Sequence, residues 1–268
     1  MSGGGAAFDG TRAYASTGNN VDCPQQPPCP SFPPLALSNS LLQVNPYGAQ
    51  NLGLGQISQF QPPQASSWVN GDADLGSSRV IVVPGTNYVL VGGKAGNIYI
   101  LDRTSLTGGS LMATFHVGAG NTSSIGPIIS GGLAYWNRTI YTWSGYDTLR
   151  SFSLDSALLN SLPSQNPPSN PPNNEQGSGL SVSSNFDTNG LLWTVVPSGE
   201  HNDAAGGHIQ AYDLSNFNQA LWSHDLNGEE IMKFIAPVVA NGKVYVTTNG
   251  SKATMPLTPP HLLVYGLP

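Results

Sequence analysis

Residues Val239–Thr248 read VANGKVYVTT and contain the pattern that decides the fold. An Asn-Gly pair stands at positions 241–242, and alternating β-branched and aromatic residues follow it. Asn and Gly accept the positive φ angles of tight two-residue turns, whereas Val, Tyr and Thr favour strands. The segment therefore predicts a hairpin turn that leads into a β-strand.

The same unit of turn plus strand recurs along the chain. Close copies are Phe8–Thr17 (FDGTRAYAST) and Tyr135–Ser144 (YWNRTIYTWS), and looser copies are Pro84–Gly92 (PGTNYVLVG) and Asp187–Val195 (DTNGLLWTV). The turns fall near residues 10, 86, 137, 189 and 241. The last three intervals are about 50 residues, which is the length of a four-stranded propeller blade. One such sheet cannot bury both of its faces alone, so stacked neighbours supply the core.

We therefore predict an all-β chain that folds as a β-propeller of about five four-stranded antiparallel blades. A β-sandwich is the alternative, and repetition at a fixed period makes it the weaker one. The predicted blades cover approximately residues 4–45, 76–115, 126–160, 180–224 and 234–268. The last unit ends after its third strand, at Leu263-Val264-Tyr265, so we expect a partial chain or an incomplete ring with exposed strand edges.

Three long loops are expected between these units, at 19–36, 55–75 and 161–179. Residues 19–36 and 55–67 are rich in Pro, Gln and Ser, and residues 161–179 in Pro, Asn and Ser. Such segments have little apolar area to bury. We therefore expect irregular structure there, and the last loop could cover a site at one end of the channel.

The composition excludes several classes of function. Only 9% of the 268 residues are charged, and the net charge is −6 with no basic run, so no cationic face for nucleic acid is expected. No apolar stretch is long enough to span a bilayer. The chain begins Met-Ser-Gly-Gly-Gly, which is not a signal peptide, but the composition is typical of secreted or periplasmic proteins.

Two cysteines, Cys23 and Cys29, are separated by a Pro- and Gln-rich stretch. Their short spacing suits a disulfide that closes a small surface loop, and two unrelated thiols are the alternative. A zinc site is not indicated, because two ligands with no flanking His do not complete one.

Two segments carry a resemblance to a known family. Gly207–Trp222 (GHIQAYDLSNFNQALW) and Val89–Arg103 (VLVGGKAGNIYILDR) resemble the repeat of pyrroloquinoline-quinone-like, or quinoprotein-type, propellers. In that repeat a strand of the form hydrophobic-Tyr-Ala-Leu-Asp leads through a turn to Leu-Trp. The resemblance implies the propeller fold, and it implies pyrroloquinoline quinone (PQQ) and calcium for those members that are dehydrogenases. The adjacent cysteine pair of those enzymes is not present in this chain.

Candidate chemistry is concentrated in two acidic segments. Asp72 and Asp74 lie in the turn NGDADLGSS, where hard carboxylate oxygens could bind calcium or act as paired acids on a saccharide. Glu200 precedes His201, which gives a second candidate for acid–base catalysis. Each segment is also typical of an ordinary solvated turn. We consider Asp72, Asp74 and Glu200 as catalytic candidates and the two aspartates as metal candidates.

Two lysines are candidates for binding an anionic cofactor or ligand. Lys94 lies in a predicted hairpin turn, and Lys233 precedes a predicted inner strand; for both, solvation is the ordinary alternative. The sequence thus favours an exported scaffold that binds a small molecule or a protein at the mouth of the channel. The alternatives are a PQQ- and calcium-dependent oxidoreductase of alcohols or sugars, and a carbohydrate-acting hydrolase or lyase. The sequence leaves the oligomeric state open.

Overall fold

The computed structural model describes the following parts of the chain: 5–18, 37–46, 57–65, 68, 73–107, 109–117, 129, 132–155, 158–159, 177–197, 206–217, 219–226, 228–232, 234–250 and 259–266. Their regular structure is almost entirely strand, as the repeated pattern predicts. No helix among these residues is both long enough and apolar enough to cross a membrane.

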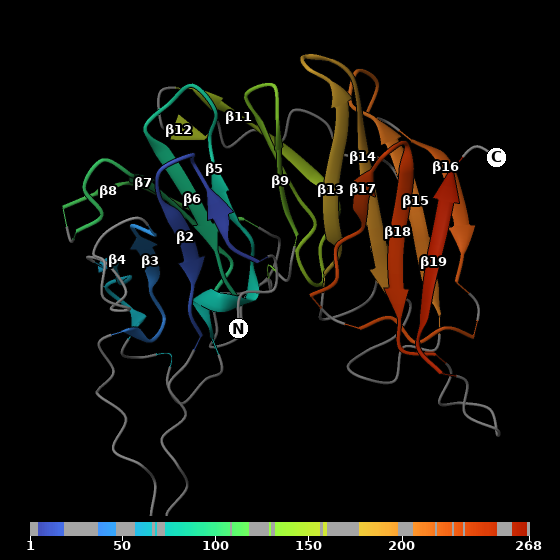
Figure 1. Cartoon of the computed structure of the whole chain (residues 1–268), viewed down its shortest axis with the longest axis horizontal. Helices are drawn as coiled ribbons and strands as arrows, with labels where there is room; N and C mark the ends of the chain where they lie inside the picture. Colours follow the sequence, from blue (N-terminus) through green and yellow to red (C-terminus); the bar gives the residue numbers. More distant parts are fainter. Residues whose placement is uncertain are drawn as a thin grey trace, which may run out of the picture.

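The strands form five antiparallel sheets (Figure 1). The first sheet contains β1 (Ala7–Phe8), β2 (Ala13–Ser16), β3 (Leu41–Val44) and β4 (Ile57–Phe60). The second contains β5 (Val80–Val82), β6 (Tyr88–Gly92), β7 (Asn97–Asp102) and β8 (Leu111–His116), and it follows the short 3-10 helix η3 (Leu75–Ser77). The third contains β9 (Leu133–Trp136), β10 (Thr139–Thr142), β11 (Arg150–Asp155) and β12 (Leu158–Leu159).

The remaining two sheets complete the series. The fourth contains β13 (Gly179–Asn185), β14 (Thr188–Pro197), β15 (Gly207–Asp213) and β16 (Ala220–Asp225). The fifth contains three strands, β17 (Val238–Ala240), β18 (Lys243–Thr248) and β19 (His261–Gly266). In every sheet each strand pairs with the next one along the chain, which is the strand order of a propeller blade.

The sheets are arranged around a common axis. The first strand of each sheet packs beside the first strand of the next, in the series β1, β5, β9, β13 and β17. In the described part of the chain, β17 and β1 do not pack against each other as the other consecutive first strands do. The fold is therefore a β-propeller of five blades, and no closed ring is detected in the described residues, which is consistent with the expected incomplete ring.

The core is divided into four clusters, one between each pair of consecutive sheets. Between the second and third sheets, Leu90 and Ile100 pack with Ile140 and Phe152. Between the third and fourth sheets, the ring of Tyr141 meets that of Phe217 edge-on at 5.4 Å between centroids. Each sheet thus buries its apolar side chains against a neighbour, which is the physical reason for the repeat.

The predicted hairpin turns are present, with one displacement. Asn241 and Gly242 have φ angles of 51° and 69°, and they join β17 to β18 as predicted. In the fourth sheet the turn lies at Phe186–Asp187 rather than at Asn189-Gly190, which belong to β14.

A contact between sheets explains this displacement. The indole of Trp136, in β9, donates a hydrogen bond from Nε1 to the backbone oxygen of Phe186 at 2.8 Å. A Cβ atom at Gly190 would lie 2.9 Å from the Trp136 ring. Gly190 therefore provides the space for the indole, and no local turn propensity reveals that role.

One predicted loop is wrong over part of its length. Residues 57–60 form β4, whereas the sequence indicated irregular structure from 55 onward. Phe60 is 2% exposed, and its ring lies 5.8 Å from that of Tyr99 in the second sheet. The first sheet therefore extends to Phe60 and beyond the predicted boundary at 45, because tertiary burial of one aromatic residue outweighs a Gln- and Ser-rich local composition. The predicted loop at 19–36 and residues 160–176 lie outside the described residues.

Candidate functional site

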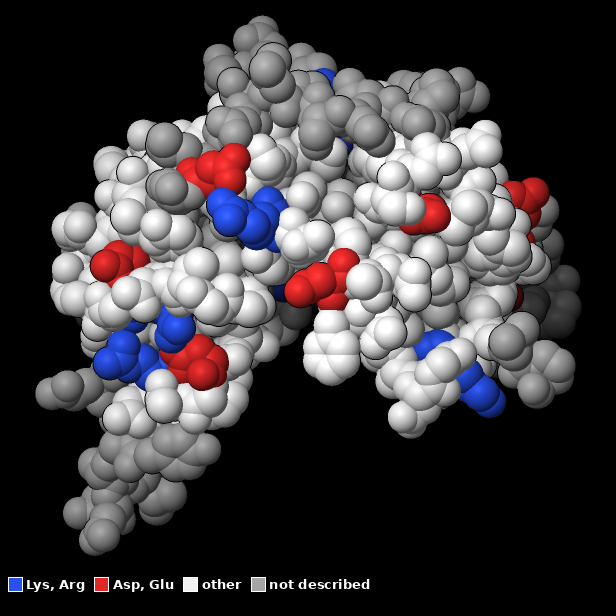
Figure 2. Space-filling model, turned by 90° about the horizontal axis from the view of Figure 1, so that it is seen from above, with Lys and Arg blue, Asp and Glu red and all other residues white. Residues whose placement is uncertain are grey.

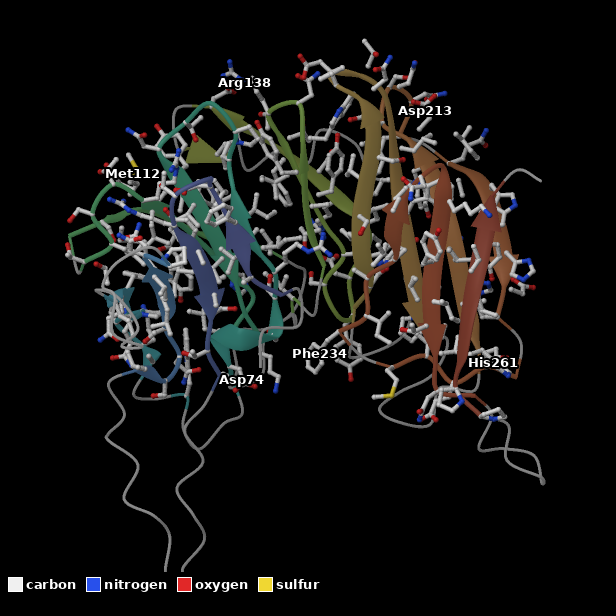
Figure 3. All side chains as sticks on the ribbon, in the orientation of Figure 1. Asp74, Met112, Arg138, Asp213, Phe234 and His261 are labelled. Atoms are coloured by element: carbon white, nitrogen blue, oxygen red, sulfur yellow. The ribbon has the colours of Figure 1, made fainter. Side chains whose placement is uncertain are left out.

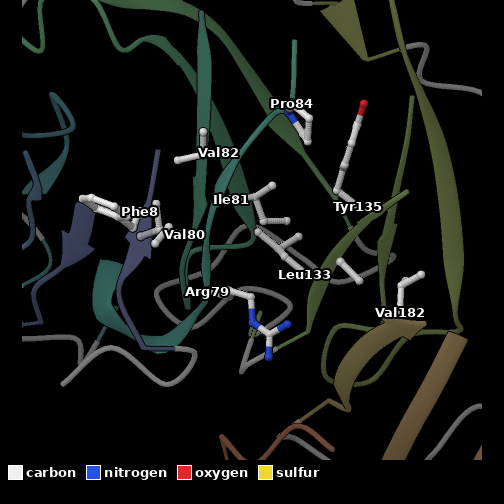
Figure 4. Close-up of a pocket in the computed structure, with 11 residues that line it drawn as sticks. Phe8, Arg79, Val80, Ile81, Val82, Pro84, Leu133, Tyr135 and Val182 are labelled. Atoms are coloured by element: carbon white, nitrogen blue, oxygen red, sulfur yellow. The ribbon is translucent and has the colours of Figure 1, made fainter. Parts of the chain in front are cut away.

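A pocket lies where the first strands of four sheets meet (Figure 4). It encloses about 360 Å³, which is within the range of small-molecule sites. Its walls come from β1, from β5 and the residues on either side of it, from β9 and from β13. We call this feature the axial pocket, since the same strands form the series around the propeller axis.

Most residues of the axial pocket are apolar, although its accessible surface is polar as well as apolar. Val80, Ile81 and Val82 come from β5, Leu133 from β9 and Val182 from β13. These residues lie on short strands whose neighbours are buried, so the walls are held by the core clusters. Such a surface favours an apolar ligand body.

Arg79 places a single positive charge in this lining. It directly precedes β5, and in Figure 4 it lies at one end of the pocket, with Tyr135 and Pro84 at the other. The segment before it is fixed, because Ser77 donates from Oγ to the backbone oxygen of Ile129 at 3.0 Å and Leu75–Ser77 is buried. The position of Arg79 is therefore set by packed backbone rather than by a free loop.

The guanidinium of Arg79 has no acceptor in the described part of the chain. Its Nε atom is buried without a hydrogen-bond partner. Burial lowers the pKa of Arg79 from its usual value, since low-dielectric surroundings disfavour the charged form. A guanidinium remains protonated at neutral pH even so. The pocket thus contains a charge that the described residues do not compensate.

Tyr135 is the other polar side chain of the described lining, and a phenol hydroxyl can both accept and donate a hydrogen bond. The hydroxyl oxygen of Tyr135 accepts a hydrogen bond from the backbone N–H of Arg138 at 3.3 Å. Arg79 is the one cationic group of the described lining, so it favours an anionic group of a ligand.

Two residues singled out in the sequence are brought together outside the axial pocket. Asp74 precedes η3 and Lys94 lies in the turn between β6 and β7, and the Lys94 Nζ and Asp74 Oδ2 atoms are 2.6 Å apart. The backbone N–H of Lys94 also donates to the Asp74 backbone oxygen at 2.9 Å. Their side chains are 10% and 20% exposed, so each charge compensates the other in a partly buried position. Figure 3 places Asp74 at the opposite end of the sheets from Arg138 and Asp213.

The remaining sequence candidates lie outside the described residues. They are Asp72, Glu200, Lys233, Cys23 and Cys29, and their predicted roles stay predictions. Within the described residues, no group of three or more His, Cys, Asp or Glu side chains is placed to hold a metal ion.

A further acidic cluster joins the end of the fifth sheet to the segment before it. Glu229 accepts hydrogen bonds from the hydroxyl of Thr248 and from Nδ1 of His261, the latter at 2.8 Å. Partial burial opposes the charged form of Glu229, but these two hydrogen bonds outweigh it and lower its pKa. Glu230 accepts a hydrogen bond from Asn249 Nδ2 at 2.9 Å. These contacts fasten β18 and β19 to the 229–230 segment.

The axial pocket does not fit calcium with pyrroloquinoline quinone. Calcium binds through six to eight oxygen ligands, and the described lining contains no carboxylate or amide side chain. It also offers one cation, whereas the quinone carries several acidic groups. We therefore derive no redox step at this pocket.

Sequence reasoning missed Arg79, although a signal was present. The run SSRVIVV at residues 77–83 places one charged residue directly before a continuous β-branched strand, in a chain with only nine Lys and Arg. When the strand is buried, the charge of such a residue must either reach water or be paired with an acceptor.

Comparisons with known proteins leave the family open. No protein-family model and no curated protein matches the chain. Among solved structures, the computationally designed Ika8 protein is similar at 14% identity, with a TM-score of 0.47 over 98% of this chain and 70% of that one. BamB from Moraxella catarrhalis is similar at 15% identity, with a TM-score of 0.44 over 80% of this chain and 64% of BamB. The computationally designed Ika4 protein is similar at 14% identity, with a TM-score of 0.41 over 72% of this chain and 91% of that one. These likenesses carry no statement about activity.

Proposed function

We propose that this chain is an exported binding scaffold that takes up a ligand in the axial pocket. The observation that carries the proposal is a pocket lined mostly by apolar residues, with Arg79 as its one cation and the Arg79 Nε atom without a partner in the described residues. Concave, mostly apolar pockets with few polar groups are typical of small-molecule sites. The described lining contains no pair of acidic or nucleophilic side chains, so binding is a better account of it than catalysis.

The architecture supports a binding role. The walls come from strands of four different sheets, and the clusters between these sheets fix their positions. Sites built on packed strands need little reorganisation, which reduces the free-energy cost of binding. The scaffold would hold a ligand without closing over it.

The proposed exported location rests on composition. Charged residues are 9% of the chain, and the two cysteines have a spacing that suits a loop disulfide. Figure 2 shows that charged side chains are sparse and scattered over the face seen from above. The experiment for this part is expression with a secretory leader, followed by mass mapping of the Cys23–Cys29 peptide with and without reductant.

A neutral apolar dye tests the binding role. N-phenyl-1-naphthylamine fluoresces when it enters an apolar pocket, and we expect saturable binding to the chain. Val182→Phe, which adds volume to the half-buried wall on β13, should weaken that binding at least about tenfold. Val82→Phe repeats the test from the β5 wall in case the first variant is unstable.

Phe186→Asn is the matched control, because Phe186 is 90% exposed on the turn between β13 and β14. Its dye binding should equal that of the unmodified chain. Equal binding by folded Val182→Phe and Val82→Phe variants would rule out the axial pocket as the site. Thermal unfolding of each variant establishes that it is folded.

A further inference from the structure

Resting on the binding role proposed above, we propose that the axial pocket takes a small apolar monocarboxylate, with its carboxylate bound by Arg79. The step beyond a general binding role is the chemical class of the ligand. It follows from the charge, the shape and the walls of the pocket.

Arg79 differs from the other arginines in having no acceptor. Arg103 pairs with Asp9, Arg138 with Asp155 and Arg150 with Asp147. Arg12 donates to the backbone oxygens of Arg103 and Thr104. In the described residues, each of the other four guanidinium groups thus has at least one acceptor, although Arg150 Nε is unpaired like Arg79 Nε. An uncompensated buried charge costs free energy, and a bound anion would recover it.

One guanidinium matches one carboxylate better than it matches a phosphate. The planar fork of two N–H groups donates to both oxygens of a carboxylate in parallel. No second Lys or Arg is part of the described lining. A phosphate dianion would leave one negative charge without a cation in the described lining, whereas a carboxylate makes the site neutral.

The rest of the ligand must be compact. The half-buried side chains of Val82 and Val182 belong to the lining and favour an apolar ligand body beside them. A volume of about 360 Å³ accommodates a body of one or two rings or a short branched chain.

Two probes of nearly equal shape test the inference, 2-naphthoate and its neutral amide, 2-naphthamide. Isothermal titration calorimetry at pH 7 measures both on the unmodified chain and on Arg79→Gln, Arg79→Lys and Arg138→Gln. Arg138 is the control arginine, because its side chain is 70% exposed and pairs with Asp155. Competition with N-phenyl-1-naphthylamine establishes that each probe occupies the pocket.

We expect 2-naphthoate to bind more tightly than 2-naphthamide, and Arg79→Gln to weaken 2-naphthoate alone by about 10- to 100-fold. Arg79→Lys should give an intermediate loss, since it keeps the charge but not the fork. Arg138→Gln should change neither affinity by more than about twofold.

If folded Arg79→Gln binds 2-naphthoate as tightly as the unmodified chain, the carboxylate assignment is wrong. The general binding role would still hold in that case, provided that the chain binds the dye and Val182→Phe abolishes this binding. A loss of thermal stability in Arg79→Gln would also overturn the assignment, because it would identify Arg79 as a structural ion. If neither the dye nor either naphthalene probe binds, the proposed function fails together with this inference.

Discussion

Two arginines of the second sheet, Arg103 and Arg79, are in opposite situations. Arg103 Nη1 lies 2.5 Å from Asp9 Oδ2, and Nε and Nη2 of Arg103 donate to the Thr86 backbone oxygen at 3.2 and 3.0 Å. Arg79, beside the axial pocket, has no such acceptor in the described residues. The difference teaches that a partly buried cation with its acceptors inside the chain serves the fold, whereas one without them in the described residues is a candidate for binding a ligand.

The region around Arg103 links the first two sheets. Asp9 also accepts hydrogen bonds from the hydroxyl of Tyr14 at 2.8 Å and from the backbone N–H of Thr11 at 2.9 Å. Gln43 donates from Nε2 to the Arg103 backbone oxygen at 2.6 Å. Both oxygens of the Asp9 carboxylate thus accept hydrogen bonds at this interface, and a buried network stabilises a fold when its members are paired.

The largest expected effect comes from removing Arg103. Arg103→Met leaves the Asp9 carboxylate, 2% exposed, without its cation, and should lower the free energy of unfolding by about 3 kcal/mol. Urea denaturation followed by tryptophan fluorescence measures it. Arg138→Met, which breaks an exposed ion pair, is the control and should cost under about 1 kcal/mol. Equal effects of the two variants would show that the Arg103 network adds nothing beyond surface charge.

Acid should weaken the first interface before the central ones. Burial opposes ionisation of Asp9, but hydrogen bonds from Thr11, Tyr14 and Arg12 outweigh it and hold its pKa well below the usual value. A carboxyl whose pKa is lower in the folded state stabilises the fold fully above the unfolded-state pKa, near about 4, and progressively less as the pH falls below it.

Hydrogen exchange at pH 7 and pH 3 measures this acid effect. Amides of β2 and β3 should lose protection at pH 3, while those of β10 and β14 keep it after correction for intrinsic rates. The fifth sheet should lose a smaller part, because the pKa of Glu229 is lowered too. Uniform loss across all sheets would contradict the prediction.

The smallest expected effect has the opposite sign. Arg79→Met removes an uncompensated charge from an apolar wall and should raise the free energy of unfolding by about 1 kcal/mol. The same variant should lose 2-naphthoate binding, so stability and binding would change in opposite directions. Urea denaturation without ligand measures the gain, and a decrease in stability would place Arg79 with Arg103 among the structural ions.

The fold could be predicted from the sequence because its signals are local. The Asn-Gly turn at 241–242 and the strands that end at Asp102 and Asp213 repeat one unit, and each unit is read from a few adjacent residues. Strand β4 was missed because its evidence is the burial of Phe60 against Tyr99, far along the chain.

The candidate site was harder to predict, because it depends on which charges find partners. Asp74 and Lys94 were both singled out, yet their pairing depends on how η3 meets the turn between β6 and β7. Arg79 was not singled out, because a lone arginine before a strand has the same local sequence whether or not an acceptor lies nearby.

The contact of Trp136 with Gly190 and with the backbone of Phe186 also bears on how the chain unfolds. The β13–β14 hairpin cannot separate from the third sheet without losing an indole hydrogen bond and the close fit of a ring against a glycine. Blades of a repeat protein can open one at a time when their junctions are weak. Here the third and fourth blades should open as one cooperative unit, so that a partly unfolded form would retain both or neither.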